Sequence, residues 1–385
     1  MDDARAADDG AARAATEPML PDYGGACLSS VVPALLGRGG GVPDWLPAPA
    51  ATAEQVVLLV LDGLGWEQLQ RWGTHAPTLA SGAGGPITSV VPTTTATALT
   101  SIATGTTPAD HGVIGYRMVL PAGTGGDQLV LNVLRWRAGT RDGRRLVPAP
   151  QLQPHRAFGG APVPAVTRTD FTPTGFTAAH LAGSRIVGWR VPSTMVVEIG
   201  RQLRAGERFV YAYYDGVDNV AHEHGIGEHY LAELRAADRL VADIAAELPP
   251  GAALVVVSDH GQVEVGNSAR LPSTEVMEMV SLISGEGRFR WLHAKPGAAA
   301  DLAKVADEAH GHEAWVRTRQ QMIDERWFGG PLRPEVADRL GDVALVARDP
   351  VAFLDPADTG ETRLLARHGS LTAEEMLVPL LAFAP

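Results

Sequence analysis

Runs of consecutive apolar residues mark the main predicted strands of this chain. The clearest are VVLLVLD at 56–62, RFVYAYYD at 208–215 and LVVV at 254–257, with a weaker signal at 186–189. Strands that are apolar on both faces are typical of a parallel sheet covered by helices on both sides. Residues 230–248 carry apolar residues at helical spacing and predict a long amphipathic helix. We therefore expect an α/β fold with a mostly parallel central sheet flanked by helices.

Two segments interrupt this pattern. Residues 120–175 are rich in Gly, Pro and Arg, and predict an excursion from the core with a short hairpin at Leu129–Trp136. Residues 267–350 predict a small inserted α/β subdomain, because strand-like and helix-like stretches alternate again within them. The catalytic α/β core then consists of 21–266, which includes the excursion, and 351–385.

The amino-acid composition excludes several functional classes of protein. The net charge of −12 argues against binding to a nucleic-acid duplex, which basic proteins normally achieve through phosphate contacts. No apolar stretch approaches the ~18–20 residues of a membrane helix, so no membrane association is expected. Residues 1–20 are polar, lack the apolar region of a secretory signal and predict a disordered tail. With Cys27 as the single cysteine, we expect a cytoplasmic enzyme; the oligomeric state is left open.

The predicted strands end in potential metal ligands. Asp62 closes the first strand, Asp215 closes the second and is followed by Asp218, and Asp259 and His260 follow the third. In open α/β sheets, ligands bind beyond the carboxyl ends of the strands. Carboxylate and imidazole together suit zinc or manganese. An ordinary Asp- and Gly-containing loop would explain any one of these ends, but the repetition favours a metal site.

A further pair of potential ligands is expected on a helix. Asp218 and His222 are four residues apart, so one helical turn would place both on the same face, where they could bind one ion. The alternative is an aspartate that caps the helix and a surface histidine.

A run of hydroxyl side chains, VPTTTATA at 91–98, precedes and enters a predicted helix that ends near Thr104. Hydroxyls at a helix N-terminus often serve only as caps. The functional alternative is a nucleophile that attacks a phosphate held by backbone N–H groups and the helix dipole. A threonine hydroxyl is a poor nucleophile unless a base or metal lowers its pKa, and two metal ions would do so.

In this order, the motifs resemble those of the nucleotide pyrophosphatase/phosphodiesterase family of the alkaline phosphatase superfamily. The motifs are Asp62, Pro92–Thr95 with Thr104-Gly105, His111-Gly112, Asp218-x-x-x-His222, Asp259-His260-Gly261 and His368. The similarity extends over about 56–265 and 366–385. It implies an alkaline-phosphatase-like fold.

The resemblance also implies two divalent metal ions, with zinc expected and manganese as the alternative. One ion would be bound by Asp62, Asp259 and His260, with Thr95 as the nucleophile beside it. The other would be bound by Asp218, His222 and His368. Counting back from Thr104 aligns Thr95, rather than either preceding threonine, with the family's nucleophile.

The chain departs from the family at one position. Eukaryotic members have an asparagine three residues after the nucleophile, where this chain has Ala98. That amide helps to hold a non-bridging phosphate oxygen, so another group must take its role here. The candidates are the backbone N–H of Thr95 or Ala96 and the side chains of Asn132 and His224.

The implied function is hydrolysis of phosphodiester or nucleotide pyrophosphate bonds through a phosphothreonine intermediate, with a small phosphoester or nucleotide as substrate. A phosphonoacetate-type phosphonate hydrolase and a phosphomonoesterase of the same superfamily are the alternatives. A sulfatase is disfavoured because Cys27 lies outside the site, and a cofactor-independent phosphoglycerate mutase usually has a serine nucleophile. A metal-stabilised binding protein would not need a hydroxyl beside the metals.

Overall fold

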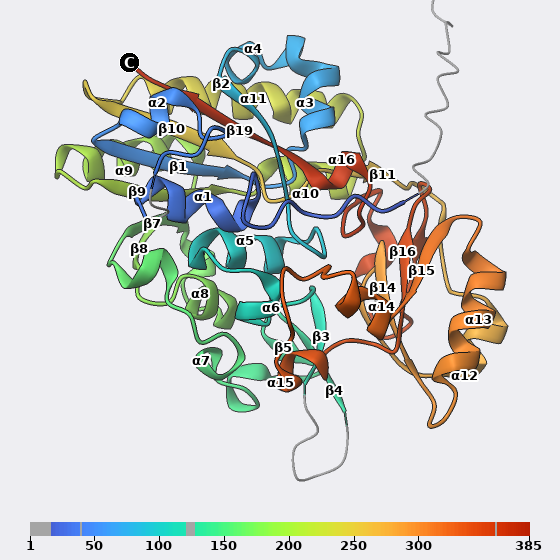
Figure 1. Cartoon of the computed structure of the whole chain (residues 1–385). Coiled ribbons are helices and arrows are strands. Elements are labelled where there is room, and N and C mark those ends of the chain that lie inside the picture. The colour runs from blue at the N-terminus through green and yellow to red at the C-terminus, as the bar shows by residue number, and fades with distance from the viewer. Residues whose placement is uncertain (1–16, 39–40, 121–127, 359) are drawn as a thin grey trace, which may run out of the picture.

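A seven-stranded sheet forms the centre of the computed structural model, which describes residues 17–38, 41–120, 128–358 and 360–385 (Figure 1). In sheet order its strands are β2 (Ala83–Thr88), β19 (Leu377–Phe383), β10 (Ala252–Val257), β1 (Gln55–Leu61), β9 (Phe209–Tyr214), β7 (Pro164–Arg168) and β8 (Arg185–Trp189). Most of the predicted tail, 1–20, lies outside the described residues.

Parallel pairing dominates this sheet. Strand β1 pairs in parallel with β10 and β9, and β7 pairs in parallel with β9 and β8. In this sheet, β19 runs antiparallel to its two neighbours, β10 and β2. The prediction of a mostly parallel central sheet flanked by helices is therefore confirmed. The three strongest predicted strands are the adjacent strands β10, β1 and β9.

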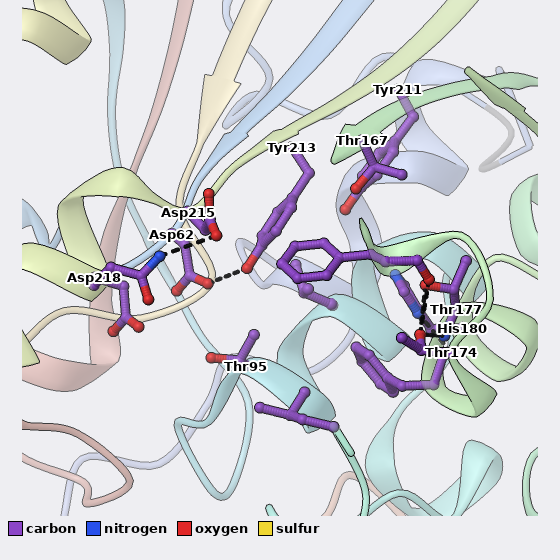
Figure 2. Close-up of a pocket in the computed structure, with 15 residues that line it drawn as sticks. Asp62, Thr95, Thr167, Thr174, Thr177, His180, Tyr211, Tyr213, Asp215 and Asp218 are labelled. Carbon is purple, nitrogen blue, oxygen red and sulfur yellow. Dashed lines mark hydrogen bonds between the residues drawn. The ribbon is translucent and has the colours of Figure 1, made fainter. Parts of the chain in front are cut away.

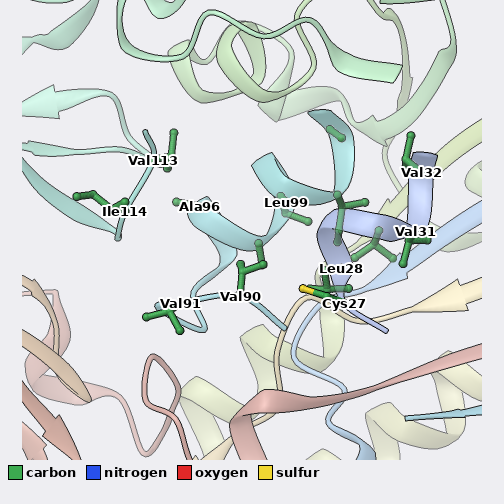
Figure 3. Close-up of a cluster of buried hydrophobic side chains, with 14 of the residues drawn as sticks. Cys27, Leu28, Val31, Val32, Val90, Val91, Ala96, Leu99, Val113 and Ile114 are labelled. Carbon is green, nitrogen blue, oxygen red and sulfur yellow. The ribbon is translucent and has the colours of Figure 1, made fainter. Parts of the chain in front are cut away.

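Helices cover both faces of the sheet, which explains why its central strands are apolar throughout. On one face, Leu58 and Val60 of β1 belong to a core shared with α1 (Leu28–Leu35) and α5 (Thr95–Thr104). Figure 3 shows α1 and α5 packed side by side in this core. The opposite face contributes alternate β1 residues to a second core with α9 (Pro192–Arg204) and α11 (Glu228–Ala245).

The remaining short helices of the described core are α2 (Ala48–Thr52), α3 (Trp66–Trp72), α4 (Pro77–Ala80), α6 (Pro108–His111), α7 (Ala149–Leu152), α8 (Gly175–His180), α10 (Gly216–His224) and α16 (Ala373–Met376). Two small ladders join β11 (Val263–Glu264) to β18 (Ala366–Arg367) and β12 (Ala269–Arg270) to β17 (Ala352–Phe353). Within the described ranges, no helix has the length and apolar character that crossing a membrane requires.

The segment 267–350 contains a second, antiparallel sheet beside the core (Figure 1). Its strands, in order, are β13 (Val280–Glu286), β14 (Phe289–Ala294), β16 (Val343–Ala347) and β15 (Ala314–Thr318). Its helices are α12 (Thr274–Met279), α13 (Ala299–His310), α14 (Arg319–Asp324) and α15 (Pro334–Ala337). The sequence pattern does not predict β13, because Ser and Gly interrupt its apolar residues.

The structure corrects two details of the segment 120–175. The hairpin predicted at Leu129–Trp136 is part of a four-stranded sheet in which β4 (Leu129–Asn132) pairs with the earlier β3 (Arg117–Leu120). The sheet continues through β5 (Arg137–Ala138) and β6 (Arg141–Asp142). Strand β7 also falls in this segment but belongs to the central sheet, and its short PAVTR sequence gives only a weak strand signal.

A buried ion pair connects the second sheet to the core. Arg288, in the turn between β13 and β14, donates to both carboxylate oxygens of Glu375 in α16, at 2.8 and 2.7 Å. Both side chains are fully buried. A third nitrogen of Arg288 donates to the carbonyls of Asp349 and Val351, each at 2.9 Å. Each charge is thus compensated only as long as its partner is present.

We expect Arg288→Ala to lower the free energy of unfolding by about 3–5 kcal/mol, because it leaves the Glu375 carboxylate buried without a partner. Urea unfolding monitored by circular dichroism measures this loss. Arg201→Ala is the control, since Arg201 pairs with Glu198 on an exposed helix face and should contribute little. Equal losses in the two variants would show that the Arg288–Glu375 pair does not stabilise the fold.

Candidate active site

The carboxyl ends of the three central strands bring the predicted acidic residues together. Asp62 directly follows β1, and Asp259 and His260 come shortly after β10. Val60 of β1 is level with Val257 of β10, so these ends lie at the same height in the sheet. The parallel register thus places side chains that are far apart in the sequence at one edge, where open α/β sheets bind their ligands.

Asp62, Asp259 and His260 form the first group of potential ligands. One ligand atom from each lies within 4.8 Å of the others. The His260 Nε2 atom is 3.4 Å from Asp62 Oδ1 and 3.5 Å from Asp259 Oδ2. All three side chains are buried, and among the described residues these two carboxylate oxygens have no hydrogen-bond donor. Buried oxygens of this kind require a cation or a proton.

The electrostatics of this group also fit a cation. Burial raises the pKa of Asp62 well above its usual value, and the nearby charges of Asp259 and Asp218 raise it further. Burial raises the pKa of Asp259 as well. The Tyr213 hydroxyl, which the sequence pattern does not single out, donates to Asp62 Oδ2 and holds that carboxylate in place. Two carboxylates and an imidazole nitrogen form a donor set that suits zinc or manganese.

The second group of predicted ligands surrounds Asp218 in α10. The Asp218 Oδ1 atom is 3.3 Å from His222 Nε2, one helical turn later, and 3.8 Å from His368 Nε2. Asp218, His260 and His368 also have ligand atoms within 4.8 Å of one another, so His260 lies between the two groups. The structure thus brings all six predicted ligands into one cluster.

Backbone carbonyls orient the two histidines of the second group. His222 Nδ1 is 2.8 Å from the Ala366 carbonyl, and His368 Nδ1 is 2.9 Å from the Thr93 carbonyl. Because a carbonyl only accepts, each Nδ1 carries the hydrogen and each Nε2 presents a lone pair toward Asp218. Burial, with repulsion from His260 and His222, lowers the pKa of His368 well below its usual value. The neutral ring is the form that binds metals.

Thr95, the first residue of α5, lies beside the first group. Its Oγ atom is 3.1 Å from His260 Nε2. The Thr93 hydroxyl instead donates to the Ser370 carbonyl at 2.7 Å and accepts from the Gly369 amide. Thr94 precedes the helix as its N-cap, without a side-chain capping bond. Of these three hydroxyls, Thr95 is the one in contact with the predicted ligands.

Two cavities meet at Thr95 and Asp218. The first has a volume of about 180 Å³. It extends from the aspartates at the carboxyl ends of the strands into a region walled by apolar and aromatic side chains (Figure 2). Its walls include Leu99, Leu134, Phe171, Phe176, Tyr211 and Tyr213. The second has a volume of about 330 Å³ and lies toward the second sheet, with more polar walls.

The structure places two of the predicted substrate contacts outside the two cavities. Asn132 lines neither cavity; its Nδ2 donates to the Tyr116 hydroxyl at 2.6 Å, and Tyr116 lines the second cavity. His224 also lines neither cavity, because its ring stacks on His229. The Ala96 side chain is fully buried, which leaves only its backbone as a candidate.

Asn219 is an amide that lines both cavities. Its Nδ2 donates to Asp215 Oδ2 at 3.0 Å, and the same oxygen accepts from Arg168 at 3.1 Å. The sequence analysis could have predicted Asn219 from its position directly after Asp218, near the start of a helix that begins at the sheet edge.

Known solved structures share this architecture. Murine ectonucleotide pyrophosphatase/phosphodiesterase 5 is similar with a TM-score of 0.63 and 15% identity, over 86% of this chain and 88% of that chain. An inactive threonine-to-alanine variant of the murine protein, in complex with AMP, has the same TM-score and coverage with 14% identity. Phosphonoacetate hydrolase from Sinorhizobium meliloti 1021, in complex with phosphonoformate, has a TM-score of 0.59 and 18% identity, over 86% and 90% of the two chains. At these identities the likeness shows an alkaline-phosphatase-like fold.

Sequence comparison gives the family directly. No curated protein matches the chain. A model of the type I phosphodiesterase/nucleotide pyrophosphatase family, however, matches residues 56–371. This range covers most of the chain and includes Thr95 and all six predicted ligands. The protein therefore belongs to the type I phosphodiesterase/nucleotide pyrophosphatase family.

Proposed function

We propose that this protein is a two-metal hydrolase of phosphodiester or nucleotide pyrophosphate bonds that acts through a phosphothreonine intermediate. The observation that carries the proposal is the position of Thr95, whose Oγ lies 3.1 Å from His260 Nε2 where two cavities meet. A hydroxyl beside clustered carboxylates and imidazoles is the arrangement of an activated nucleophile. Membership of the family supports a hydrolase of this class.

The residues present fit two divalent ions. Asp62, Asp259 and His260 would hold one, and Asp218, His222 and His368 would hold the other. When bound, such ions stabilise charge on phosphoryl oxygens and lower the pKa of hydroxyl groups and water. Zinc is the proposed metal because the donors are nitrogen and oxygen atoms, and manganese is the alternative.

Thr95 carries the bond-making step in this proposal. Its Oγ forms a bond to phosphorus as the bond from phosphorus to the leaving oxygen breaks, and that oxygen departs with the electron pair. The Thr95 proton passes to solvent, and a water molecule then cleaves the phosphothreonine and restores the hydroxyl. His260 Nε2, which would hold the ion, lies 3.1 Å from the Thr95 hydroxyl and so would place that ion beside it, and the amides of the first turn of α5 would face the developing negative charge.

The solved neighbour with AMP supports a nucleotide substrate. That murine protein is an inactive variant in which alanine replaces a threonine, and its structure contains AMP. The apolar and aromatic walls of the first cavity offer a surface for a ring-containing substituent of the phosphorus.

We expect diesters to be preferred over monoesters by at least about tenfold in kcat/KM. A diester can bury its second substituent in the apolar first cavity and gain binding energy in the transition state that a monoester cannot gain. The comparison uses bis(p-nitrophenyl) phosphate and p-nitrophenyl phosphate on one metal-loaded preparation. A preference for the monoester would reject the diesterase proposal and leave the metal site untouched. Phosphonoacetate belongs in the same series, since its hydrolysis in preference to both esters would favour the phosphonate hydrolase alternative.

A further inference from the structure

The second cavity differs in chemistry from the first, although both meet at Thr95. Its polar walls come from three parts of the chain: Tyr116 and Arg135 near the β3–β4 pair, Glu286 at the end of β13, and Arg367 beside the predicted ligand His368. A substrate phosphorus at Thr95 would therefore have a cavity with aromatic walls on one side and, on the other, a cavity whose walls carry two arginines.

Hydrogen-bond donors without acceptors line this cavity. The Arg135 side chain is exposed, and its guanidinium forms no ion pair with a described residue; its backbone N–H donates to Asn132. The Nε of Arg367 has no acceptor among the described residues, although the side chain is only 3% exposed. The Tyr116 hydroxyl oxygen accepts from Asn132, which leaves its hydrogen free to donate into the cavity.

Three carboxyl groups line this cavity: Asp218 is a predicted metal ligand, Glu361 pairs with the buried Arg290, and Glu286 forms no ion pair with a described residue. Glu286 Oε2 accepts from the Tyr116 amide at 2.9 Å, and Oε1 has no partner among the described residues. Burial raises the pKa of Glu286 to about 8, so at neutral pH the carboxyl is mostly protonated and adds a further donor. A cavity of guanidinium, hydroxyl and neutral carboxyl donors suits a ligand rich in acceptor oxygens.

We propose that the second cavity is a subsite for an anionic leaving group, a phosphate or pyrophosphate, with Arg135 as the residue that selects for it. The inference rests on the proposed function and narrows it to nucleotide pyrophosphates over diesters whose leaving group contains no phosphate. In this reaction the oxygen that bridges the two phosphoryl groups leaves with the electron pair and remains on the departing phosphate. Arg135 stabilises the negative charge of that phosphate. Arginine suits this task because its planar fork of donors matches phosphate oxygens.

The test compares two substrates that carry the same AMP group. ATP has pyrophosphate as its leaving group, and the p-nitrophenyl ester of AMP has an aryl leaving group. We expect Arg135→Gln to lower kcat/KM for ATP by about tenfold or more, and for the aryl ester by less than about twofold. The matched control is Arg137→Gln, because Arg137 is exposed on the adjacent strand β5, bonds to the Thr140 carbonyl and lines neither cavity.

The results separate this inference from the proposed function. A loss confined to ATP in Arg135→Gln, with Arg137→Gln unchanged, supports the subsite. Equal effects on both substrates, no effect, or a wild-type enzyme that cleaves only the aryl ester overturns the subsite but leaves the phosphodiesterase function standing. A wild-type enzyme that cleaves neither substrate when loaded with zinc or manganese overturns both.

Discussion

Replacing Thr95 with alanine is expected to lower kcat by roughly a thousandfold or more while the protein stays folded and keeps its metal ions. The change removes the proposed nucleophile and none of the six predicted ligands. Because the Thr95 hydroxyl bonds to His260 of the site and does not cap α5, little stability should be lost. Steady-state kinetics with bis(p-nitrophenyl) phosphate, metal analysis and thermal unfolding measure the three properties separately.

Thr94→Ala is the matched control for this experiment. Thr94 is the preceding residue and also lines the second cavity, but the Thr95 hydroxyl is the one beside His260. The control should retain kcat within a small factor of the wild type. Comparable losses in the two variants would contradict the assignment of Thr95 as nucleophile. A covalent phosphoryl group, trapped on wild-type protein and absent from Thr95→Ala, would support it independently.

Removal of divalent metal is expected to abolish turnover, and zinc or manganese should restore it. The reason lies in the buried cluster, where Asp62 and Asp259 each present an oxygen without a hydrogen-bond donor among the described residues. The measurement is activity after dialysis against a chelator and after each metal is added back, with metal content determined on the same samples. Fully active protein with only trace divalent metal would contradict the two-metal proposal.

Single-residue variants test which side chains bind the metal ions. Asp259→Asn should lose a bound ion, because an amide is a much weaker ligand than a carboxylate. Asp215→Asn is the control: Asp215 ends a neighbouring strand at the same sheet edge but bonds to Arg168 and Asn219 and belongs to neither predicted ligand group. It should retain both ions. Loss of metal from both variants would mean that the site responds to the overall negative charge of the edge and not to particular ligands.

The sheet edge is predictable from the sequence because the relevant signals are local. A buried parallel strand has apolar residues on both faces, and a polar residue such as Asp62 directly after it marks the carboxyl end. Parallel pairing then determines which ends lie together. The position of β1, β9 and β10 in a parallel sheet and the proximity of Asp62 and Asp259 therefore follow from the order of residues along the chain, whereas His368 is predicted only by the resemblance to the family.

Contacts made across the fold are not predictable in this way. In the sequence, Tyr213 is one more apolar position of β9, yet its hydroxyl reaches Asp62. Asn132 and His224 have suitable side-chain chemistry, but tertiary structure engages both outside the cavities. Glu286 comes from a strand that the apolar pattern does not show at all. The cellular location and the identity of the metal remain predictions.

The turn between β13 and β14 has a consequence for how this protein can evolve or be engineered. Glu286, the last residue of β13, lines the second cavity, and Arg288, two residues later in the turn, pairs with Glu375 of α16. One wall of the proposed leaving-group subsite and the attachment of the segment 267–350 to the core thus depend on one short stretch of chain. The segment 267–350 is therefore not expected to be exchangeable on its own, because a replacement taken from a relative would also have to provide a partner for Glu375 of α16. Substitutions in this stretch that alter the cavity wall are expected to lower the yield of folded protein when they also disturb Arg288.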